Sequence, residues 1–490
     1  MLLEDALNGI SVVDSHLLNT EVLGVESDSR QIRSGFIFVC LKGENFDGND
    51  FINEALRNGA SAIISSRKEI TEKLRLKNIA YALVEDTNEA LWRVAKSVYE
   101  NPSAALKVVG ITGTNGKTTT AWVLSQMLNE LGFASAYLGT LGVNWKGEML
   151  PLSHTTAFPS ETQRMLRFLH DDGAEYVVME VSSHALSQKR IDGVEFDVGV
   201  FTNLTQDHLD FHSSIEDYFM AKRRLFFELP TSKKIITVAN NDDEFGRKIL
   251  QASDNRIGFG FQFTDLQARN ISFGSNWLKF NFSYLEKDYE VNANLGGRFN
   301  IENCLSAIGG AIALGIDPKK CASVMKNVTP APGRFESVSQ GEDFSVIVDY
   351  AHTPDALDKL LSSVRELRPK RVITVFGCGG DRDRTKRPKM GDVVSKYSDI
   401  SYVTSDNPRT EDPNHIIEDI LPGMNSGSTV RVEPDRASAI KSAIEEAQKG
   451  DIVVIAGKGH EDYQILGKTK VYFDDRVVAK KAIQEKVLCK

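Results

Sequence analysis

A glycine-rich segment with one lysine and two threonines is where residue types and spacing first indicate chemistry. It follows an apolar run and comprises Gly113, Thr114, Asn115, Gly116, Lys117, Thr118 and Thr119. Glycines let backbone N–H groups face phosphate oxygens, and a following helix adds a favourable dipole. We expect Lys117 to reach the terminal phosphates of a nucleotide and Thr118 to bind Mg²⁺. The spacing departs from the standard phosphate loop because Ile111 replaces the first glycine, and a chance glycine-rich turn is the alternative.

Two further residues suit a divalent metal ion beside a nucleotide. Glu180 ends an apolar run, and His208 lies in the polar segment after another run. Together with phosphate oxygens they suit Mg²⁺ or Mn²⁺ that keeps several waters. Each residue alone is more often structural. Lys222 precedes Arg223 and Arg224, and composition alone favours a solvated basic helix face there.

The elements that position these residues are predicted to be buried parallel strands. Continuous apolar runs occur at residues 176–179, 198–201, 372–376 and 452–456, and polar segments follow them directly. Helical patterns intervene, for example over residues 303–314, so the alternation indicates α/β folding. Residues 278–284 instead alternate apolar and polar side chains, which predicts a half-exposed antiparallel strand. In α/β sheets ligands bind beyond the carboxyl ends of strands, where the polar segments stand.

Bulk composition excludes several classes of protein. The chain has 490 residues and a net charge of −9, which predicts several domains and argues against a general nucleic-acid surface. The five cysteines are scattered, which favours a reducing compartment over a disulfide framework. The N-terminus is acidic and no apolar stretch is long enough for a membrane span. We expect a cytoplasmic protein with no nucleic-acid or membrane partner, and a monomer.

Several motifs together resemble the Mur ligases over essentially the whole chain. They are Thr-Gly-Thr-Asn-Gly-Lys-Thr-Thr, Glu-Val-Ser-Ser-His-Ala-Leu, Thr-Asn-Leu-Thr-Gln-Asp-His and Asp-Tyr-Ala-His-Thr-Pro. The resemblance implies three α/β domains. These are a small UDP-sugar-binding domain (1–105), a central P-loop-type ATPase domain (106–332) and a C-terminal Rossmann-like domain (333–490) that binds an amino acid.

The resemblance also implies an ATP-dependent amide-forming ligase of peptidoglycan precursor synthesis. The carboxylate of a UDP-N-acetylmuramoyl-dipeptide attacks the ATP γ-phosphate, and an amino acid displaces phosphate from the acyl phosphate. Lys222 matches a lysine that becomes carbamylated and binds a second metal ion with Glu180 and His208. That role reverses the interpretation from composition. The other implied contacts are Ser29 to UDP, Thr155, Thr156, Ser182, Gln188 and Arg190 to the muramoyl peptide, and Asn300, Asn303, Arg334 and Asp349 to ATP.

The segment Asp406-Asn407-Pro408-Arg409 matches the part of the family that selects the amino acid. Its arginine form marks enzymes that use meso-diaminopimelate, whose second carboxylate a guanidinium can bind bidentately. L-lysine would instead bring an ammonium toward Arg409. By the same resemblance, the remaining amino-acid contacts are Arg387, Gly457 and Glu461. Without the resemblance, a simple Asn-Pro turn followed by a surface arginine explains this segment as well as a binding site does.

Departures and rival hypotheses remain at this stage. The family commonly has Asn-Thr-Thr-Pro where this chain has His154-Thr-Thr-Ala157, and Asn49 replaces a usual His or Arg.

An L-lysine-adding enzyme or a folylpolyglutamate synthase relative is the alternative within the class. Arg409 argues against the first, and the N-terminal Asp28-Ser-Arg30 block argues against the second. A P-loop regulatory NTPase is the alternative from another class, and it predicts hydrolysis without an acceptor.

Overall fold

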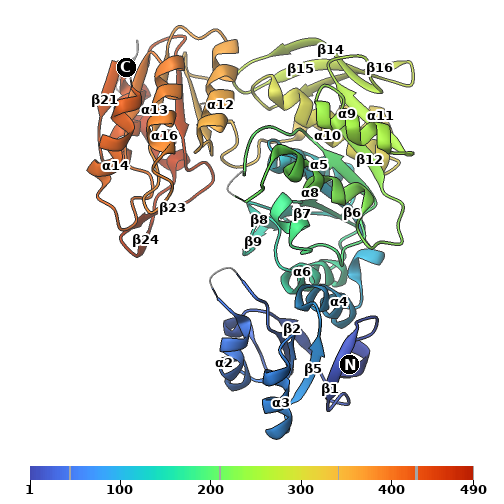
Figure 1. The fold of residues 1–490 in the computed structure, drawn as a ribbon. Coiled ribbons are helices and arrows are strands. Elements are labelled where there is room, and N and C mark those ends of the chain that lie inside the picture. Colours follow the sequence, from blue (N-terminus) through green and yellow to red (C-terminus); the bar gives the residue numbers. More distant parts are fainter. Residues whose placement is uncertain (44–45, 209–210, 340, 425–428, 489–490) are drawn as a thin grey trace. The chain divides into compact units, whose positions relative to one another are not determined.

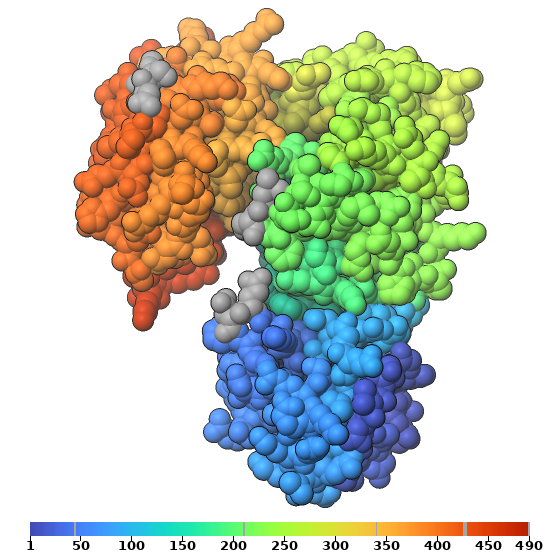
Figure 2. Space-filling model, in the orientation of Figure 1, coloured from blue at the N-terminus to red at the C-terminus, as the bar shows by residue number. Residues whose placement is uncertain are grey.

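The computed structural model describes residues 1–43, 46–208, 211–339, 341–424 and 429–488 (Figure 1). Its internal contacts divide the chain into two compact units. The first comprises residues 1–266 and 306–317, and the second comprises residues 267–305 and 318–490. Figure 2 shows the same chain as a space-filling surface coloured by residue number. Among the described residues, no helix has the length and apolar character needed to cross a membrane.

The N-terminal part of the first unit is a sheet in the order β1-β5-β4-β3-β2, with β1 antiparallel to β5 and the other pairs parallel. Helices cover both faces, because alternate strand residues point to opposite sides. One core gathers α1 and α4, and the other gathers α2 and α3. The elements are α1 (Leu3–Ala6), β1 (Val12–His16), β2 (Gly24–Glu26), η1 (Ser29–Gln31), β3 (Phe36–Val39), η2 (Gly48–Phe51), α2 (Ile52–Arg57), β4 (Ala60–Ser65), α3 (Lys68–Leu76), β5 (Ala80–Val84), α4 (Thr87–Val98) and η3 (Pro102–Ala104).

The rest of the first unit carries parallel strands in the order β13-β12-β11-β6-β10-β7, and the antiparallel strands β8 and β9 continue the sheet. The apolar runs at 176–179 and 198–201 form β10 and β11, as predicted. The elements are β6 (Lys107–Thr112), α5 (Lys117–Glu130), β7 (Ser135–Gly139), β8 (Gly142–Trp145), β9 (Glu148–Leu150), α6 (Pro159–Asp171), β10 (Tyr176–Glu180), α7 (Ser183–Ser187), β11 (Val198–Phe201), α8 (Ile215–Phe227), β12 (Ile236–Asn240), α9 (Glu244–Ala252) and β13 (Arg256–Gly260).

The second unit begins with the antiparallel strands β14 (Leu266–Phe273), β15 (Leu278–Tyr284) and β16 (Lys287–Ala293). In β15 the residues Leu278, Phe280 and Phe282 are buried, and their neighbours are more exposed. The predicted half-exposed antiparallel strand is therefore confirmed. Next come α10 (Phe299–Ala313), of which the residues from Ser306 onward belong to the first unit, and then α11 (Pro318–Val324) and η4 (Met325–Asn327). Helix α10 begins four residues before the predicted start at Asn303 and so includes Asn300.

The C-terminal part of the second unit is a doubly wound sheet in the order β17-β18-β22-β19-β20-β21, parallel except at β17. Helices α12, α13 and α14 pack on one face, and α15 and α16 pack on the other. The elements are β17 (Glu336–Ser337), β18 (Ser345–Asp349), α12 (Pro354–Glu366), β19 (Val372–Phe376), α13 (Lys386–Tyr397), β20 (Ile400–Val403), α14 (Pro413–Ile420), η5 (Leu421–Gly423), β21 (Thr429–Val432), α15 (Arg436–Glu446), β22 (Ile452–Ala456), β23 (Tyr463–Leu466), β24 (Thr469–Tyr472) and α16 (Asp475–Leu488).

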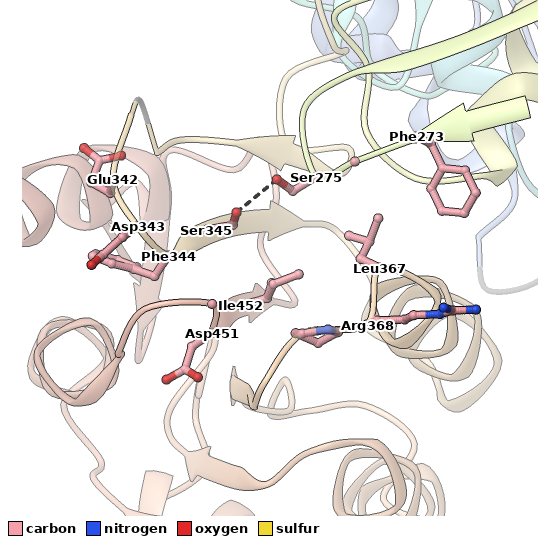
Figure 3. A pocket seen from close by; sticks show the side chains of 13 residues that line it. Phe273, Ser275, Glu342, Asp343, Phe344, Ser345, Leu367, Arg368, Asp451 and Ile452 are labelled. Carbon is pink, nitrogen blue, oxygen red and sulfur yellow. Dashed lines mark hydrogen bonds between the residues drawn. The ribbon is translucent and has the colours of Figure 1, made fainter.

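A pocket of about 340 Å³ in the second unit lies at the amino ends of β18 and β22 (Figure 3). Ser345 and Ile452, which begin these strands, line the pocket, and Ser345 shares a 2.9 Å hydrogen bond with Ser275. The residues predicted to bind ligands follow the carboxyl ends of the strands. This pocket is therefore at the opposite end of the sheet from the candidate site.

Candidate functional site

The predicted phosphate loop joins β6 to α5, as its sequence indicates. Gly113 and Gly116 have φ of +150° and +84°, values that L side chains rarely adopt. A Cβ at Gly113 would lie 1.9 Å from Thr202 Oγ1, so a side chain has no room there. Lys117 Nζ donates to the carbonyl oxygens of Gly113 and Thr114 at 3.0 and 2.9 Å. The lysine therefore lies over its own loop, where a nucleotide phosphate would be received.

The segment after β11 fixes the shape of this loop. Thr114 N donates to Asn203 O at 2.8 Å, and Asn115 N donates to Asn203 Oδ1 at 3.0 Å. Thr202 Oγ1 donates to Asn115 O at 2.6 Å. Thr119 is buried in the first turn of α5. The loop is thus held in place by the segment that follows β11.

Glu180 lies at the carboxyl end of β10 with its side chain fully buried. Its carboxylate accepts hydrogen bonds from Thr118 Oγ1 at 2.9 Å, Tyr137 Oη at 2.6 Å and Thr140 N at 2.9 Å. A buried carboxylate needs such partners. The contact to Thr118 places the two expected metal-binding oxygens side by side.

Lys222, on α8, is fully buried instead of lying on a solvated helix face. Its Nζ donates to Gly113 O at 2.8 Å and lies 4.4 Å from the centroid of the Tyr218 ring. Burial, and secondly the charge of Lys117, lower the pKa of Lys222 well below its ordinary value, while Asp207 acts in the opposite direction. The interpretation from composition is therefore wrong, and the amine is positioned to be uncharged more easily than a surface lysine.

His208 lies in a cluster of aromatic rings that includes Tyr218. Its ring centroid is 5.0 Å from that of His184 and 5.9 Å from that of Tyr218. The backbone at His208 has φ of +53°. Within the described part of the chain, no three His, Cys, Asp or Glu side chains meet to form a metal cage. Glu180 and Lys222 thus both lie at the phosphate loop, and His208 lies near the ring of Tyr218, which also borders the Lys222 amine.

The residues expected to bind the peptide lie together next to Glu180. Thr156 Oγ1 donates to Glu180 O at 2.9 Å and accepts from Ser182 N at 3.0 Å. Arg190 donates to Thr156 O at 3.1 Å and to Gln188 Oε1 at 2.9 Å. This group therefore forms one network.

Thr155 joins the same region through Thr140, because their hydroxyls lie 3.1 Å apart. The ring of Phe158 stacks against the Arg190 guanidinium, 4.2 Å from its centroid. The unusual His154 has a lowered pKa, mainly because of burial and secondly because of Arg190.

The N-terminal candidates are held by local contacts. Ser29 Oγ donates to Glu54 Oε2 at 2.6 Å. Asn49, the other departure from the family pattern, donates to Asp47 Oδ1 at 2.7 Å and accepts from Ser65 Oγ at 2.7 Å. Asn49 therefore stabilises the loop that precedes α2.

The expected ATP contacts of the second unit fall into two groups. Asn300 and Asn303 are buried in the first turns of α10, where Asn303 Nδ2 donates to Asn300 Oδ1 at 2.8 Å. Arg334 and Asp349 form the second group. Asp349 accepts from the backbone N–H groups of Phe335 and Ala351 at 2.7 and 2.8 Å. Burial raises the pKa of Asp349, and Arg334 opposes that effect.

Arg334 lies beside a tyrosine and a histidine. Its guanidinium carbon is 4.7 Å from the Tyr350 ring centroid, and its buried Nε has no hydrogen-bond partner among the described residues. His460 lies 5.1 Å from Tyr350 between ring centroids. Burial, followed by the charge of Arg334, lowers the pKa of His460 to about 4, so this imidazole is neutral at pH 7.

The residues expected to bind the amino acid meet at the carboxyl ends of β20 and β22. Asn407 Nδ2 donates to Glu461 Oε2 at 3.0 Å. Lys458 Nζ is fully buried and donates to Asn407 Oδ1 and Glu461 Oε2 at 3.2 and 3.1 Å. Asp406 is 3.9 Å from the same ammonium. A Cβ at Gly457 would lie 2.7 Å from Asp406 Oδ2, so these two segments are closely interlocked.

Arg409 follows this group with its backbone at φ of +52°. Its N–H donates to Ile465 O at 3.0 Å, and Nη1 donates to Gly380 O at 2.7 Å. A Cβ at Gly379 would lie 3.0 Å from Arg409 Nη1 and 3.8 Å from Arg382 Cγ. Pro408 also packs closely, since a Cβ at Gly380 would lie 1.9 Å from Pro408 O. Gly379 thus leaves space for the arginine side chains, and Gly380 leaves space for the carbonyl of Pro408.

Arg387 is the expected contact that the structure places differently. Its side chain is 0% exposed, and it donates to Glu411 at 2.9 Å and Asp419 at 2.8 Å. Both carboxylates belong to this chain, so the guanidinium joins the start of α13 to α14 and to the segment before it. Arg387 therefore forms a buried ion pair with Glu411 and Asp419, and its direct contact with the amino acid stays a prediction.

Sequence reasoning missed Lys458, His460 and Arg382. The first two lie in the polar Gly-Lys-Gly-His-Glu segment that follows β22, and Arg382 lies in the segment that follows β19. Both segments were identified as ligand-side loops by their position after apolar runs. That position was the available signal, but it does not rank the residues within a loop.

Comparison with known proteins gives the same family for all three parts of the chain. Residues 21–107 match the family model described as "Mur ligase family, catalytic domain". Residues 111–311 match "Mur ligase middle domain", and residues 333–459 match "Mur ligase, glutamate ligase domain".

Individual relatives are similar along nearly their whole length. UDP-N-acetylmuramoyl-L-alanyl-D-glutamate--2,6-diaminopimelate ligase from Syntrophomonas wolfei subsp. wolfei is 43% identical over 474 residues, which are 96% of each chain. The protein of the same name from Geobacillus kaustophilus is 40% identical over 477 residues, again 96% of each. A solved structure with that name has a TM-score of 0.71 and 31% identity, and the match covers 99% of both chains.

Proposed function

The chain belongs to the Mur ligase family, and from this premise we propose that it adds meso-diaminopimelate to UDP-N-acetylmuramoyl-L-alanyl-D-glutamate. The reaction consumes ATP and forms an amide bond in peptidoglycan precursor synthesis. The relatives that match 96% of the chain carry the name of this activity. The proposed setting is the cytoplasm, with a monomer as the working unit.

The observation that carries the proposal is the position of Glu180 between two groups of residues. Its carboxylate bonds Thr118 of the phosphate loop, and its backbone carbonyl bonds Thr156 of the peptide-side network. A ligase of this kind must bring the γ-phosphate of ATP to a substrate carboxylate. One residue that contacts both groups supports that encounter, which a nucleotide switch would not require.

In the proposed mechanism the protein mainly positions reactants and neutralises charge. Lys117 leaves the carbonyls of its loop and binds the phosphates of ATP. Arg190 and the hydroxyls of Thr155 and Thr156 orient the acceptor. The terminal carboxylate of the acceptor attacks the γ-phosphorus, and ADP leaves. The amine of the amino acid then attacks the acyl carbon, and phosphate leaves with the oxygen that bridged carbon and phosphorus.

The donor atoms at Thr118 and Glu180 fit Mg²⁺. A hydroxyl and a carboxylate 2.9 Å apart are hard oxygen ligands, and Mg²⁺ characteristically takes few protein ligands and retains waters. Bound there, the ion would offset the charge of the phosphate oxygens. The cofactors proposed are thus ATP as the co-substrate and Mg²⁺ held by Thr118 and Glu180.

Carbamylation of Lys222 is the second proposed feature of the metal site. An uncharged amine adds CO2 and releases a proton, and a buried lysine with a lowered pKa supplies that amine more readily. The product is a carboxylate on a side chain whose amine now donates to Gly113 O. It would serve as an oxygen ligand, with His208 as its proposed partner from the neighbouring segment.

The specificity for diaminopimelate rests on Arg409 and Glu461. The guanidinium of Arg409 is suited to the distal carboxylate, which L-lysine lacks. Glu461 is suited to an ammonium, and Lys458 and Asn407 hold its carboxylate in place. The lysine-adding enzyme remains the second candidate, because Glu461 alone would accept lysine as well.

Phosphate release tests this proposal most simply. The protein is assayed with ATP, Mg²⁺ and the UDP-muramoyl-dipeptide, and with meso-diaminopimelate, L-lysine or no amino acid. We expect turnover that depends on diaminopimelate. In Arg409→Lys the preference for diaminopimelate over lysine should fall by about 10- to 100-fold, as expected for a lost bidentate contact. Arg431→Lys, a change at a half-exposed pair with Glu446, is the matched control.

The rival functions give different outcomes in the same assay. Turnover with L-lysine but not with meso-diaminopimelate identifies the lysine-adding enzyme. Equal turnover without any amino acid contradicts the ligase and supports a regulatory NTPase.

A further inference from the structure

A fully buried ion pair lies beneath the residues proposed to bind the amino acid. Arg436 begins α15 and Asp475 begins α16, and both side chains are 0% exposed. Arg436 Nε donates to Asp475 Oδ1 at 2.8 Å and Nη2 donates to Asp475 Oδ2 at 2.7 Å. This bidentate geometry fixes the plane of the guanidinium. The remaining N–H donors are therefore aimed in defined directions.

Those donors bind the ends of two strands. Nη2 donates to Ala456 O at 3.0 Å, and Nη1 donates to Ser405 O at 3.3 Å. Ala456 directly precedes Gly457, and Ser405 directly precedes Asp406. The strands β22 and β20 are not neighbours in the sheet, because β19 lies between them. One guanidinium thus spans β19 and ties together the two loops that carry the amino-acid residues.

The two loops also have little freedom to move independently. Gly457 has φ of +119°, and a Cβ there would meet Asp406 Oδ2 at 2.7 Å and Arg436 Nη2 at 3.9 Å. A shift of either strand end would change the distance between Asn407 and Glu461, which now share a 3.0 Å hydrogen bond.

Stability alone is a weak reason for such a pair. Removing two charges from water is costly, and apolar residues of similar volume often stabilise a core equally well. A guanidinium that also binds two strand-end carbonyls supplies directional contacts that apolar packing does not.

We propose that Arg436, oriented by Asp475, is a positioning residue that sets the spacing of the Asp406–Arg409 and Gly457–Glu461 segments for the amino-acid substrate. This inference rests on the proposed function. It assigns to Arg436 an effect on amino-acid affinity that should be separable from effects on ATP and on folding.

The test compares Arg436→Lys with Arg371→Lys in the full chain. Arg371 binds Asp451 at the opposite end of the same sheet, with Nε and Nη2 at 3.0 and 2.6 Å from Oδ2. Thermal unfolding and the KM values for ATP and meso-diaminopimelate are measured for both variants. We expect Arg436→Lys to raise the KM for diaminopimelate about 10-fold while the KM for ATP changes less than about 2-fold. Arg371→Lys should leave both KM values near those of the wild type.

Asp475→Asn provides a second, milder variant in case Arg436→Lys does not fold. It keeps the shape of the side chain and removes the charge that orients the guanidinium, so the KM for diaminopimelate should rise about 3-fold. Equal effects of Arg436→Lys and Arg371→Lys, or equal changes in both KM values, would overturn the inference. An unchanged KM in Asp475→Asn would overturn it as well. A wild type without amino-acid dependence would instead refute the proposed function itself.

Discussion

At the scale of single residues, Lys222 shows how burial changes the chemistry of a common side chain. Its amine donates to Gly113 O at 2.8 Å and lies 4.4 Å from the centroid of the Tyr218 ring. Burial and the nearby Lys117 lower its pKa. The uncharged form is the one that reacts with CO2, so acid should suppress carbamate formation and alkali should favour it.

Labelled CO2 gives a direct readout of this residue. Wild-type protein exposed to ¹³C-bicarbonate should show a carbamate carbon resonance by NMR. The reason is that burial lowers the pKa of Lys222, so its amine is more readily neutral. Lowering the pH through the pKa of Lys222 should protonate the amine, weaken the signal and reduce the ligase rate in parallel.

Lys222→Met is the variant for this experiment, and Lys248→Met is its control because Lys248 is half exposed and pairs with Glu244. The signal should disappear only in Lys222→Met, together with most of the activity. A resonance that persists in Lys222→Met, or full activity without carbamate, would contradict the assignment.

The sequence allowed some residues to be predicted more reliably than others. Lys117, Thr118 and Glu180 were predictable because a loop motif and a strand end define their positions. The burial of Lys222 was not predictable from composition, because Arg223 and Arg224 beside it make the segment resemble a solvated helix face. The pairing of Arg387 with Glu411 and Asp419 was also hidden, since it depends on how α13 and α14 pack.

At the scale of elements, the candidate residues follow the carboxyl ends of parallel strands. The apolar runs that became β10, β11, β19 and β22 were visible in the sequence because buried parallel strands are continuously apolar. Helix α10 extends four residues further toward the N-terminus than predicted. Its first turn contains the polar residue Asn300, which accepts from Asn303 Nδ2 and donates to Gly296 O before the helix, and hydrophobic periodicity does not detect such a turn.

Arg387 provides a prediction at this scale, because it joins two helices. The hydrogen bond that Arg387 donates to Glu411 is the main cause of the lowered pKa of Glu411, which falls from 4.5 to about 2. Arg387→Met should lower the free energy of unfolding at neutral pH by about 2 kcal/mol, since it removes the buried charged donor of the largely buried Glu411 carboxylate. Denaturant unfolding of wild type and variant measures this difference.

The pH dependence of that difference follows from the lowered pKa. The stabilising contribution of ionised Glu411 is fully present above about pH 4.5 and is lost as the pH falls toward about 2. The difference in unfolding free energy between wild type and Arg387→Met should therefore become smaller over this range. Arg384→Met is the control, because Arg384 contacts the same Glu411 from an exposed position. A difference in unfolding free energy that stays constant with pH would contradict the ion pair. A change in the KM for the amino acid without a loss of stability would argue for direct substrate contact.

At the scale of the whole molecule, the two units carry different parts of the proposed chemistry. Lys117, Glu180 and Lys222 belong to the first unit, and Arg334, Arg409 and Glu461 belong to the second. The domain boundaries at residues 105 and 332 remain a proposal. The family assignment came from several motifs together, and no single element would have sufficed.

In the proposed reaction the acceptor carboxylate attacks ATP before the amino acid reacts. The measurement that tests it most directly uses UDP-muramoyl-dipeptide labelled with ¹⁸O in its terminal carboxylate, together with ATP, Mg²⁺ and meso-diaminopimelate. Mass spectrometry of the released phosphate then reports the origin of its oxygen. A single labelled oxygen should appear in each released phosphate, because the bridging oxygen leaves with the phosphate. Phosphate without label, formed at the same rate as the amide product, would contradict an acyl phosphate intermediate.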